Sequence, residues 1–321
     1  MRDRFGPVVK TITTVDALRA ELDAARAEGL TVGLVPTMGA LHEGHLSLID
    51  RSVADCGVTV VSIFVNPTQF RPGEDLDRYP RQLERDSEHC AGHGTDILFA
   101  PPLEEIYPDG FSSNVSIRGI TETLCGDRTR RGPEHFDGVA TVVAKLFNIA
   151  QPNFAYFGQK DAQQVAVIRR LVSDLDFRVQ VVSCPTVREQ DGLAMSSRNA
   201  YLSPEDRGRA LGLFAALCAA REAVSKGERD AERVTAAALE QLDAVDRVEY
   251  FELVDPDTLE PVESIERPVL AAVAAQVGAT RLIDNTILQP APVADTAISY
   301  DFPPLTRANN SQKPITQGAA V

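Results

Sequence analysis

Apolar and polar positions follow two alternating patterns along the first 184 residues. Short runs rich in Val, Ile and Leu have the length of strands that are buried on both faces. The stretches between them carry apolar residues three or four positions apart, as amphipathic helices do. The expected strands are 31–36, 58–65, 96–100, 154–157 and 178–184, and the expected helices are 15–28, 46–53, 75–92, 137–150 and 162–175. Strands that alternate with helices predict an α/β fold with a doubly wound parallel sheet.

The pattern changes after Pro185. The expected elements are then two helices at 205–226 and 231–242 and short strands at 248–254, 271–277 and 280–284. This order predicts a second, smaller α+β domain. Periodicity ends near residue 286, and five prolines in the remaining segment predict a disordered tail. We therefore predict domains at 1–186 and 187–285 and a tail at 286–321.

The chain has 32 Lys and Arg residues against 46 Asp and Glu residues, a net charge of −14. A negative surface repels phosphate backbones and argues against general binding of nucleic acid or anionic membranes, although a local basic pocket for one small anion is compatible with it. The sequence has no run of 18 apolar residues, and its N-terminus lacks the apolar core of a secretory signal. Five widely spaced cysteines without a CxxC pair argue against a disulfide framework or a structural zinc site. We expect a cytoplasmic protein with no nucleic-acid or membrane partner.

The most specific local pattern is PTMGALHEGH at 36–45, which follows an expected strand and opens an expected helix. His42 and His45 are three positions apart, so both imidazoles can lie on one helix face. The turn and the helix start offer N–H groups and a positive dipole end to an anion, and Gly44 leaves room for a phosphate or ribose. The pattern indicates a nucleoside triphosphate site, with two ordinary helix-start histidines as the alternative. The HExxH, GxxxxGK[ST] and GxGxxG motifs are absent, which argues against a zinc protease, a Walker-type ATPase and a classical dinucleotide site.

A second polar cluster, FGQKDAQQ at 157–164, also runs from a strand into a helix. Lys160 is placed to offset charge on a phosphate. Asp161 can bind a ribose hydroxyl or cap the helix, and the two interpretations stay open. Gln164 is expected to point from the first helical turn toward the same crevice.

Of two further polar clusters, 191–199 lies at the predicted domain boundary and 66–70 directly follows the strand that ends at Val65. Ser196, Ser197 and Arg198 can supply hydroxyls, N–H groups and a cation to a pyrophosphate, and Asn66 and Gln69 can hold hydroxyls or a carboxylate, or merely close a loop. Ligands of doubly wound sheets bind beyond the carboxyl ends of the strands. We therefore expect the four clusters to form one crevice.

In combination these segments resemble the pantothenate synthetases, the pantoate–β-alanine ligases. The resemblance is carried, in this order, by 36–45, FVNPTQF at 64–70, YPR at 79–81, HFDGV at 135–139, 157–164 and DGLAMSSRN at 191–199. It extends from about residue 10 to 285. Each motif alone occurs in other nucleotidyltransferase-type enzymes, whereas six in order point to one family.

The resemblance implies an AMP-forming ligase that joins pantoate to β-alanine with ATP and Mg²⁺, through a pantoyl adenylate, and releases pyrophosphate. It also implies a homodimer with a Rossmann-like N-terminal domain and a C-terminal α+β lid domain. Both its ligands, pantoate and β-alanine, are small molecules, and ATP is a substrate.

Site residues are carried over position by position from the resembling motifs. The expected ATP-binding residues are Met38, His42, His45, Gly158, Lys160, Asp161, Val187, Met195, Ser196, Ser197 and Arg198. Among them, His42, His45, Lys160 and Arg198 are expected to be catalytic, by meeting charge that develops on the phosphates. Gln69, Gln164 and Asn66 are expected to bind pantoate, and Asp86 is expected to approach Mg²⁺.

The sequence departs from the family pattern at two places. Gln159 replaces a usual Glu, which keeps the size and removes a charge, so we expect little effect on the site. The segment before His135 contains Arg128, Arg130 and Arg131, and no role is assigned to any of them. Two other functions remain as alternatives: a different adenylyl- or cytidylyltransferase with the same HxGH site, and a non-catalytic nucleotide sensor that retained the fold.

Overall fold

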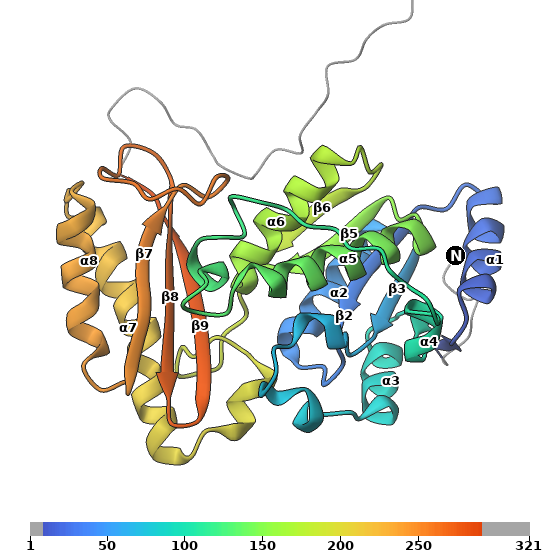
Figure 1. The fold of residues 1–321 in the computed structure, drawn as a ribbon, viewed down its shortest axis with the longest axis horizontal. Helices are drawn as coiled ribbons and strands as arrows, with labels where there is room; N and C mark the ends of the chain where they lie inside the picture. The colour runs from blue at the N-terminus through green and yellow to red at the C-terminus, as the bar shows by residue number, and fades with distance from the viewer. Residues whose placement is uncertain (1–8, 291–321) are drawn as a thin grey trace, which may run out of the picture. The chain divides into compact units, whose positions relative to one another are not determined.

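The computed structural model describes residues 9–290 of the chain (Figure 1). Six parallel strands form one sheet in the order β1-β4-β3-β2-β5-β6. Their bounds are β1 Lys10–Ile12, β2 Val32–Thr37, β3 Val58–Ile63, β4 Ile97–Phe99, β5 Phe154–Gly158 and β6 Gln180–Cys184. The chain turns from β2 to β3 on one side and later returns to β5 on the other side of β2. This order confirms the predicted α/β fold with a doubly wound parallel sheet.

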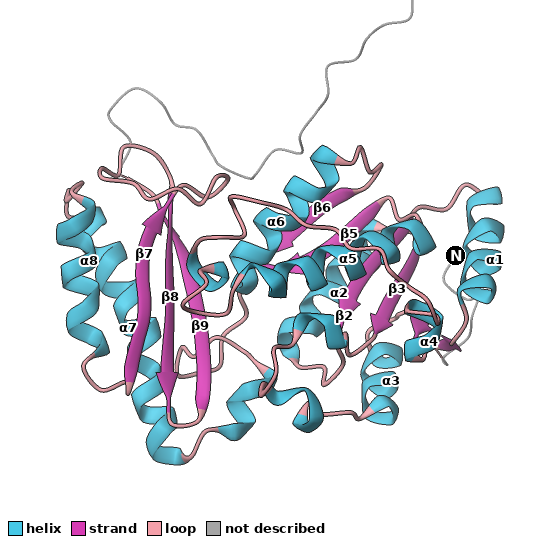
Figure 2. Ribbon diagram, viewed as in Figure 1, coloured by secondary structure: helices cyan, strands magenta, loops and turns pink. Residues whose placement is uncertain are grey.

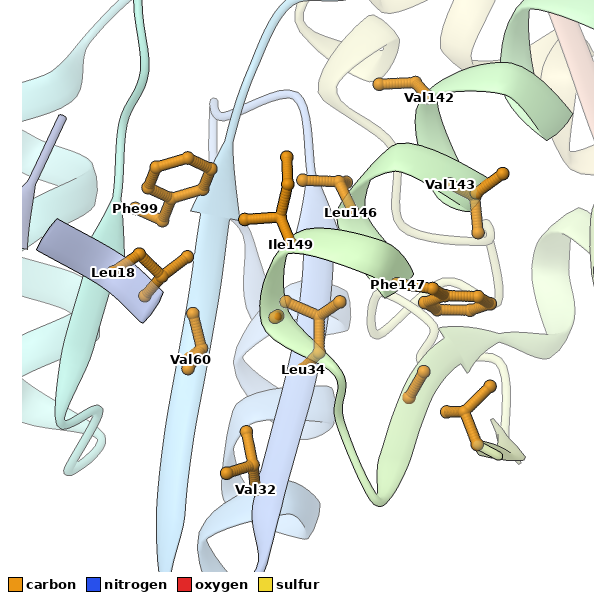
Figure 3. Packing of buried hydrophobic residues seen from close by; sticks show 14 of the residues in the cluster. Leu18, Val32, Leu34, Val60, Phe99, Val142, Val143, Leu146, Phe147 and Ile149 are labelled. Carbon is orange, nitrogen blue, oxygen red and sulfur yellow. The ribbon is translucent and has the colours of Figure 1, made fainter. Parts of the chain in front are cut away.

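Helices cover both faces of the parallel sheet because successive strand residues point to opposite faces. On one face, Leu34 and Val60 pack against α1 (Val15–Ala27), α5 (Pro133–Ala150) and α6 (Ala162–Asp174). Figure 3 shows Leu146, Phe147 and Ile149 of α5 above these strands. On the other face, the next residues along the same strands pack against α2 (Glu43–Asp55) and α3 (Leu83–Gly92). Both faces of these strands are therefore buried, which explains why the strands consist mainly of apolar residues in the sequence.

A second sheet of three antiparallel strands follows in the order β7-β8-β9 (Figure 2). The elements of this part are α7 Pro204–Ser225, α8 Ala231–Leu239, β7 Arg247–Val254, β8 Val269–Val277 and β9 Thr280–Leu288. Both helices pack on one face of the small sheet. The other face, through Leu270, Ala272 and Ala274, packs against Phe136 of α5 and Val167 of α6. The small sheet thus shares a buried apolar cluster with helices α5 and α6, while the boundary at 186/187 and the lid role stay predictions.

Several expected elements differ from those in the structure. The helix expected at 75–92 is broken at Pro80, because proline disfavours helical geometry in the residue before it. It consists of a short 3₁₀ turn, η2 (Asp75–Arg78), and α3. Strand β1 and the short helix α4 (Leu103–Ile106) were not expected from the periodicity, since each is only a few residues long.

The third strand of the small sheet extends past its predicted end. The tail predicted from residue 286 begins inside β9, because pairing with β8 continues as far as Leu288. Residues 291–321 lie outside the described part of the chain. Within residues 9–290, no helix combines the length and the apolar character that a membrane span requires.

Candidate active site

Three of the four polar clusters begin at the carboxyl ends of the neighbouring strands β3, β2 and β5, and the fourth lies in the connection after the next strand, β6. The histidine segment follows β2, and Asn66 and Gln69 follow β3. The Lys160 segment follows β5, and the Ser196 segment lies in the connection after β6. Because the strands are parallel, their carboxyl ends lie at one edge of the sheet. The sheet order therefore brings together the clusters that the sequence placed in one crevice.

Exposure divides the predicted site residues into three groups. Most are half-buried, as expected of side chains that line a crevice: Met38, His42, His45, Gln69, Gly158, Lys160, Gln164, Val187, Met195, Ser196, Ser197 and Arg198. Asp161 is exposed. Asn66 and Asp86 are each only 1% exposed, so these two support the site from beneath rather than line it.

The two histidines form the start of α2 and stack on each other, with ring centroids 4.1 Å apart. His42 is the N-cap residue, and its Nδ1 accepts the N–H of Gly44 at 3.1 Å. The Nδ1 of His45 in turn accepts the N–H of His42 at 3.4 Å. Since each Nδ1 is an acceptor, each neutral ring carries its proton on Nε2. The pair therefore presents two Nε2–H donors.

Both histidines are neutral at physiological pH. Burial, reinforced by the Lys160 ammonium, lowers the pKa of His42 from 6.5 to about 4. Burial, with further contributions from His42 and Lys160, lowers the pKa of His45 to about 3. Lys160 thus acts electrostatically on both rings, and its turn follows β5, the strand next to the one that leads into the histidines. A cation and two neutral donors in one place suit an anionic ligand.

Three consecutive backbone N–H groups before α2, at residues 39–41, are not available to an anion, contrary to the sequence-based expectation. The N–H of Gly39 donates to Thr37 Oγ1 at 3.1 Å, and those of Ala40 and Leu41 donate to Asp86. Gly44 also serves a different purpose from the one expected. A Cβ at this position would lie 2.9 Å from the His42 ring, so the glycine makes room for the imidazole.

The Gln69 amide is held in place by Asn66. Asn66 Nδ2 donates to Gln69 Oε1 at 3.0 Å and to Gly138 O at 3.1 Å, while its Oδ1 accepts the Tyr107 hydroxyl at 2.9 Å. Gln69 Nε2 then donates to Met38 Sδ at 3.0 Å. These contacts satisfy both the amide nitrogen and the amide oxygen of Asn66. Asn66 therefore supports Gln69 and does not itself line the crevice.

The HFDGV segment starts α5 and supports the same loop, a role that the sequence did not reveal. His135 Nδ1 donates to Gln69 O at 2.7 Å, and Arg131 lies 3.3 Å from His135 Nε2. Burial, with Arg131 adding to the effect, lowers the pKa of His135 to about 3. A Cβ at Gly138 would collide with the backbone of Thr68, so only glycine allows α5 to approach the loop.

The three arginines to which no role was assigned lie in different surroundings. Arg131 pairs with Glu74 at 2.9 Å and is the one that reaches His135. Arg130 pairs with Glu252 of β7 at 2.8 Å, whereas Arg128 is largely exposed. Arg131 is therefore the arginine connected to the Gln69 loop.

The turn that carries Lys160, η4 (Gln159–Asp161), is held by hydrogen bonds from a strand of the small sheet. Asn285 of β9 donates through Nδ2 to the carbonyls of Gln159 and Lys160 at 2.9 and 2.8 Å. Sequence reasoning missed Asn285, because no local motif marks it. The Oε1 of Gln159 accepts the Ser183 hydroxyl at 2.6 Å. Asp161 stands at the N-cap position of α6 without a capping hydrogen bond from its side chain, which removes the capping interpretation.

The connection after β6 folds back on itself before the serine segment. Met195 N–H donates to Val187 O at 3.0 Å, which places these two residues side by side. Ser196 caps the 3₁₀ turn η5 (Ser197–Tyr201), its Oγ accepting Arg198 N–H at 3.3 Å. A Cβ placed on Gly44 would lie 3.8 Å from the Met195 Cβ, so this segment faces the histidine helix.

Comparison with known proteins identifies the family of the chain. The sequence profile of the pantoate-beta-alanine ligases matches residues 10–287. A pantothenate synthetase from Acetivibrio thermocellus is 51% identical over 283 residues, which cover 88% of this chain and 100% of the relative. The chain belongs to the pantoate-beta-alanine ligase family.

Solved structures of the family have the same fold. A pantothenate synthetase from Thermus thermophilus superposes with a TM-score of 0.83 at 48% identity, covering 88% of this chain and 100% of that one. A pantoate-beta-alanine ligase from Francisella tularensis, solved in complex with β-γ ATP and β-alanine, gives a TM-score of 0.70 at 33% identity, covering 87% and 97%. The chain is accordingly a ligase that forms pantothenate from pantoate and β-alanine with ATP.

Proposed function

We propose that the reaction proceeds through a pantoyl adenylate formed in the crevice around His42, His45 and Lys160. The supporting observation is that the neutral histidine pair follows β2 and the Lys160 turn follows β5, the neighbouring parallel strand, so that both lie at the edge of the sheet where the carboxyl ends of four strands meet. The two Nε2–H groups and the Lys160 ammonium hold the phosphates of ATP, together with Ser196, Ser197 and Arg198. They act as donors placed in advance where negative charge increases during the reaction.

The nucleoside part of ATP lies along the Val187–Met195 pair and the end of β5. Asp161 is exposed, and its carboxylate accepts the ribose hydroxyls. Gly158 ends β5 and has open space around it, so the ribose reaches its backbone. Val187 presents its backbone to adenine, and Met38 and Met195 provide apolar contact.

Pantoate binds between Gln69 and Gln164. Its carboxylate oxygen attacks the α-phosphorus, the bond from that phosphorus to the bridging oxygen breaks, and pyrophosphate leaves with the electron pair. The β-alanine amine then attacks the acyl carbon, the C–O bond to AMP breaks, and the amine loses its proton to solvent. No protein side chain becomes a nucleophile, so catalysis consists of positioning and charge stabilisation.

The Mg²⁺ that the family resemblance implies does not fit the carboxylate predicted for it. Asp86 is buried, and each of its two oxygens accepts a backbone N–H. Mg²⁺ prefers octahedral oxygen coordination and retains several waters, which this environment does not accommodate. No group of three or more acidic, His or Cys side chains suited to a metal occurs within residues 9–290. We therefore assign no step to a protein-bound metal.

The test is pantoate-dependent exchange of labelled pyrophosphate into ATP, with Mg²⁺ and without β-alanine. Exchange that requires pantoate is expected, because adenylate formation is reversible and independent of the amine. Pantothenate formation without any pyrophosphate exchange would refute an adenylate step that precedes the attack of β-alanine. The homodimer and the cytoplasmic location implied by the resemblance are part of the proposal, and a monomeric mass in light scattering would refute the first.

A further inference from the structure

The segment that carries His42 into the site has an unusual backbone. Gly39 and Ala40 both have positive φ, 81° and 52°, and the second is not a glycine. A left-handed conformation is unfavourable for an alanine, so other contacts must hold Ala40 in it. The conformation turns the N–H groups of Ala40 and Leu41 toward α3.

The Asp86 carboxylate is what receives those N–H groups. Its Oδ2 accepts from Ala40 at 2.9 Å and its Oδ1 accepts from Leu41 at 2.8 Å. Asp86 stands in the first turn of α3, where the helix dipole favours a negative charge. A Cβ at position 39 would lie 2.9 Å from Oδ2, so the contact also requires Gly39.

This arrangement resembles an anion-binding turn in which the protein supplies its own anion. The consecutive N–H groups of Ala40 and Leu41, which would otherwise be free to bind a phosphate, donate to the Asp86 carboxylate instead. The turn leads directly into His42, whose N–H and Nδ1 take part in the stacked pair. Fixing the turn therefore fixes the direction of both Nε2–H groups.

We propose that Asp86 is a positioning residue, which locks the Gly39–Leu41 turn and thereby orients the histidine pair toward the ATP phosphates, and that it is not a ligand of Mg²⁺. The proposal rests on the proposed role of the histidines in ATP binding. It differs from a metal role in one decisive respect: positioning acts on ATP even when no divalent metal is present.

The experiment measures ATP binding by calorimetry in EDTA for wild type, Asp86→Asn and Glu84→Gln, an exposed carboxylate in the same helical turn. An amide cannot accept both N–H groups, so the turn adopts its binding-competent conformation less often, and the affinity for ATP is expected to be about 10- to 100-fold weaker. Glu84→Gln is expected to bind like wild type. Ala40→Gly in the Asp86→Asn background is expected to recover part of the loss, because glycine adopts positive φ at low cost.

The opposite result identifies a metal ligand. Unchanged ATP binding of Asp86→Asn in EDTA, together with pyrophosphate exchange that excess Mg²⁺ restores, would overturn the proposal. Should Asp86→Asn not fold, amide hydrogen exchange of the wild-type protein decides the question. The Ala40 and Leu41 amides are expected to exchange at least about 100-fold more slowly than in an unfolded chain, and unprotected amides would contradict the proposal. Absence of pantoate-dependent exchange in wild type would instead refute the proposed function.

Discussion

The side-chain amide of Asn66 donates a 3.0 Å hydrogen bond to Gln69 Oε1 and so decides which end of the Gln69 amide is free to act as a donor. The orientation of Asn66 itself follows from its 3.1 Å contact with Gly138 O, because a carbonyl oxygen accepts only from the amide nitrogen. Gln69 consequently offers Nε2, at present directed to Met38 Sδ. An N–H donor is the group that a carboxylate substrate requires.

Replacing Asn66 with Asp is expected to weaken pantoate binding about 10- to 100-fold, with a much smaller effect on ATP. The carboxylate cannot donate to Gln69 Oε1, so the Gln69 amide rotates and presents its carbonyl oxygen to pantoate. Calorimetry with each ligand measures the difference. Asn114→Asp is the matched control, because Asn114 uses only its oxygen, as acceptor from Thr141. Equal losses for both ligands would show that the loop had collapsed.

His45→Ala is expected to lower adenylate formation roughly 10²- to 10³-fold while the fold is retained, the scale for removing one donor that stabilises developing charge. Pyrophosphate exchange measures the rate and circular dichroism checks the fold. His93→Ala serves as control, since this histidine caps α3 and contacts Asp50 away from the crevice. Near-normal exchange by His45→Ala would eliminate its proposed role.

Alanine substitutions of the two adjacent glutamines of α6 are expected to have different effects, one on protein stability and the other on pantoate binding. Gln163 is buried, accepts the Cys125 N–H and donates to the carbonyls of Ile120 and Thr123, so Gln163→Ala should lower the melting temperature. Gln164 is half-buried, and Gln164→Ala should weaken pantoate much more than ATP while melting near the wild-type temperature. Calorimetry and thermal melting of both variants test the pair. A reversal of the two effects would move the pantoate site to Gln163.

Three histidines whose pKa values are lowered by desolvation make the stability of the protein depend on pH. The pKa values of His42, His45 and His135 are lowered from 6.5 to about 4, 3 and 3. The unfolded chain therefore binds their protons more readily, so the stabilisation is complete above pH 6.5 and is lost as the pH falls toward 4 and 3. Urea unfolding between pH 7.5 and 4.5 should show a falling free energy of unfolding.

His135→Asn isolates one of these contributions. An asparagine can still donate to Gln69 O but does not titrate, so the slope of stability against pH should decrease by at most about 1.4 kcal/mol per pH unit within that window. An unchanged slope would show that His135 does not contribute to the acid sensitivity.

The periodicity of apolar residues in the sequence was sufficient to predict most helices and strands of the fold. Strands such as β3 and β5 were evident because both their faces are buried, so most of their positions are apolar and even Thr59 and Ser62 are buried. The break at Pro80 and the short strand β1 were not, since they depend on local geometry or on very few residues. The continuation of β9 to Leu288 depends on pairing with β8, which no pattern within residues 280–288 reveals.

The sequence by itself determined the residue types and the spacing that place His42, His45, Lys160, Gln69 and Gln164 after parallel strands, and hence at one edge of the sheet. Only the tertiary structure decided which polar residues face the crevice and which are buried beneath it and support the residues that line it. Asn66 and Asp86 stand in motifs beside ligand-facing residues, yet both are buried with their hydrogen bonds satisfied internally. Asn285 contributes from a strand more than a hundred residues beyond the turn it fixes. Such contacts join segments that are distant in the chain, and local sequence carries no record of which distant segments folding brings together.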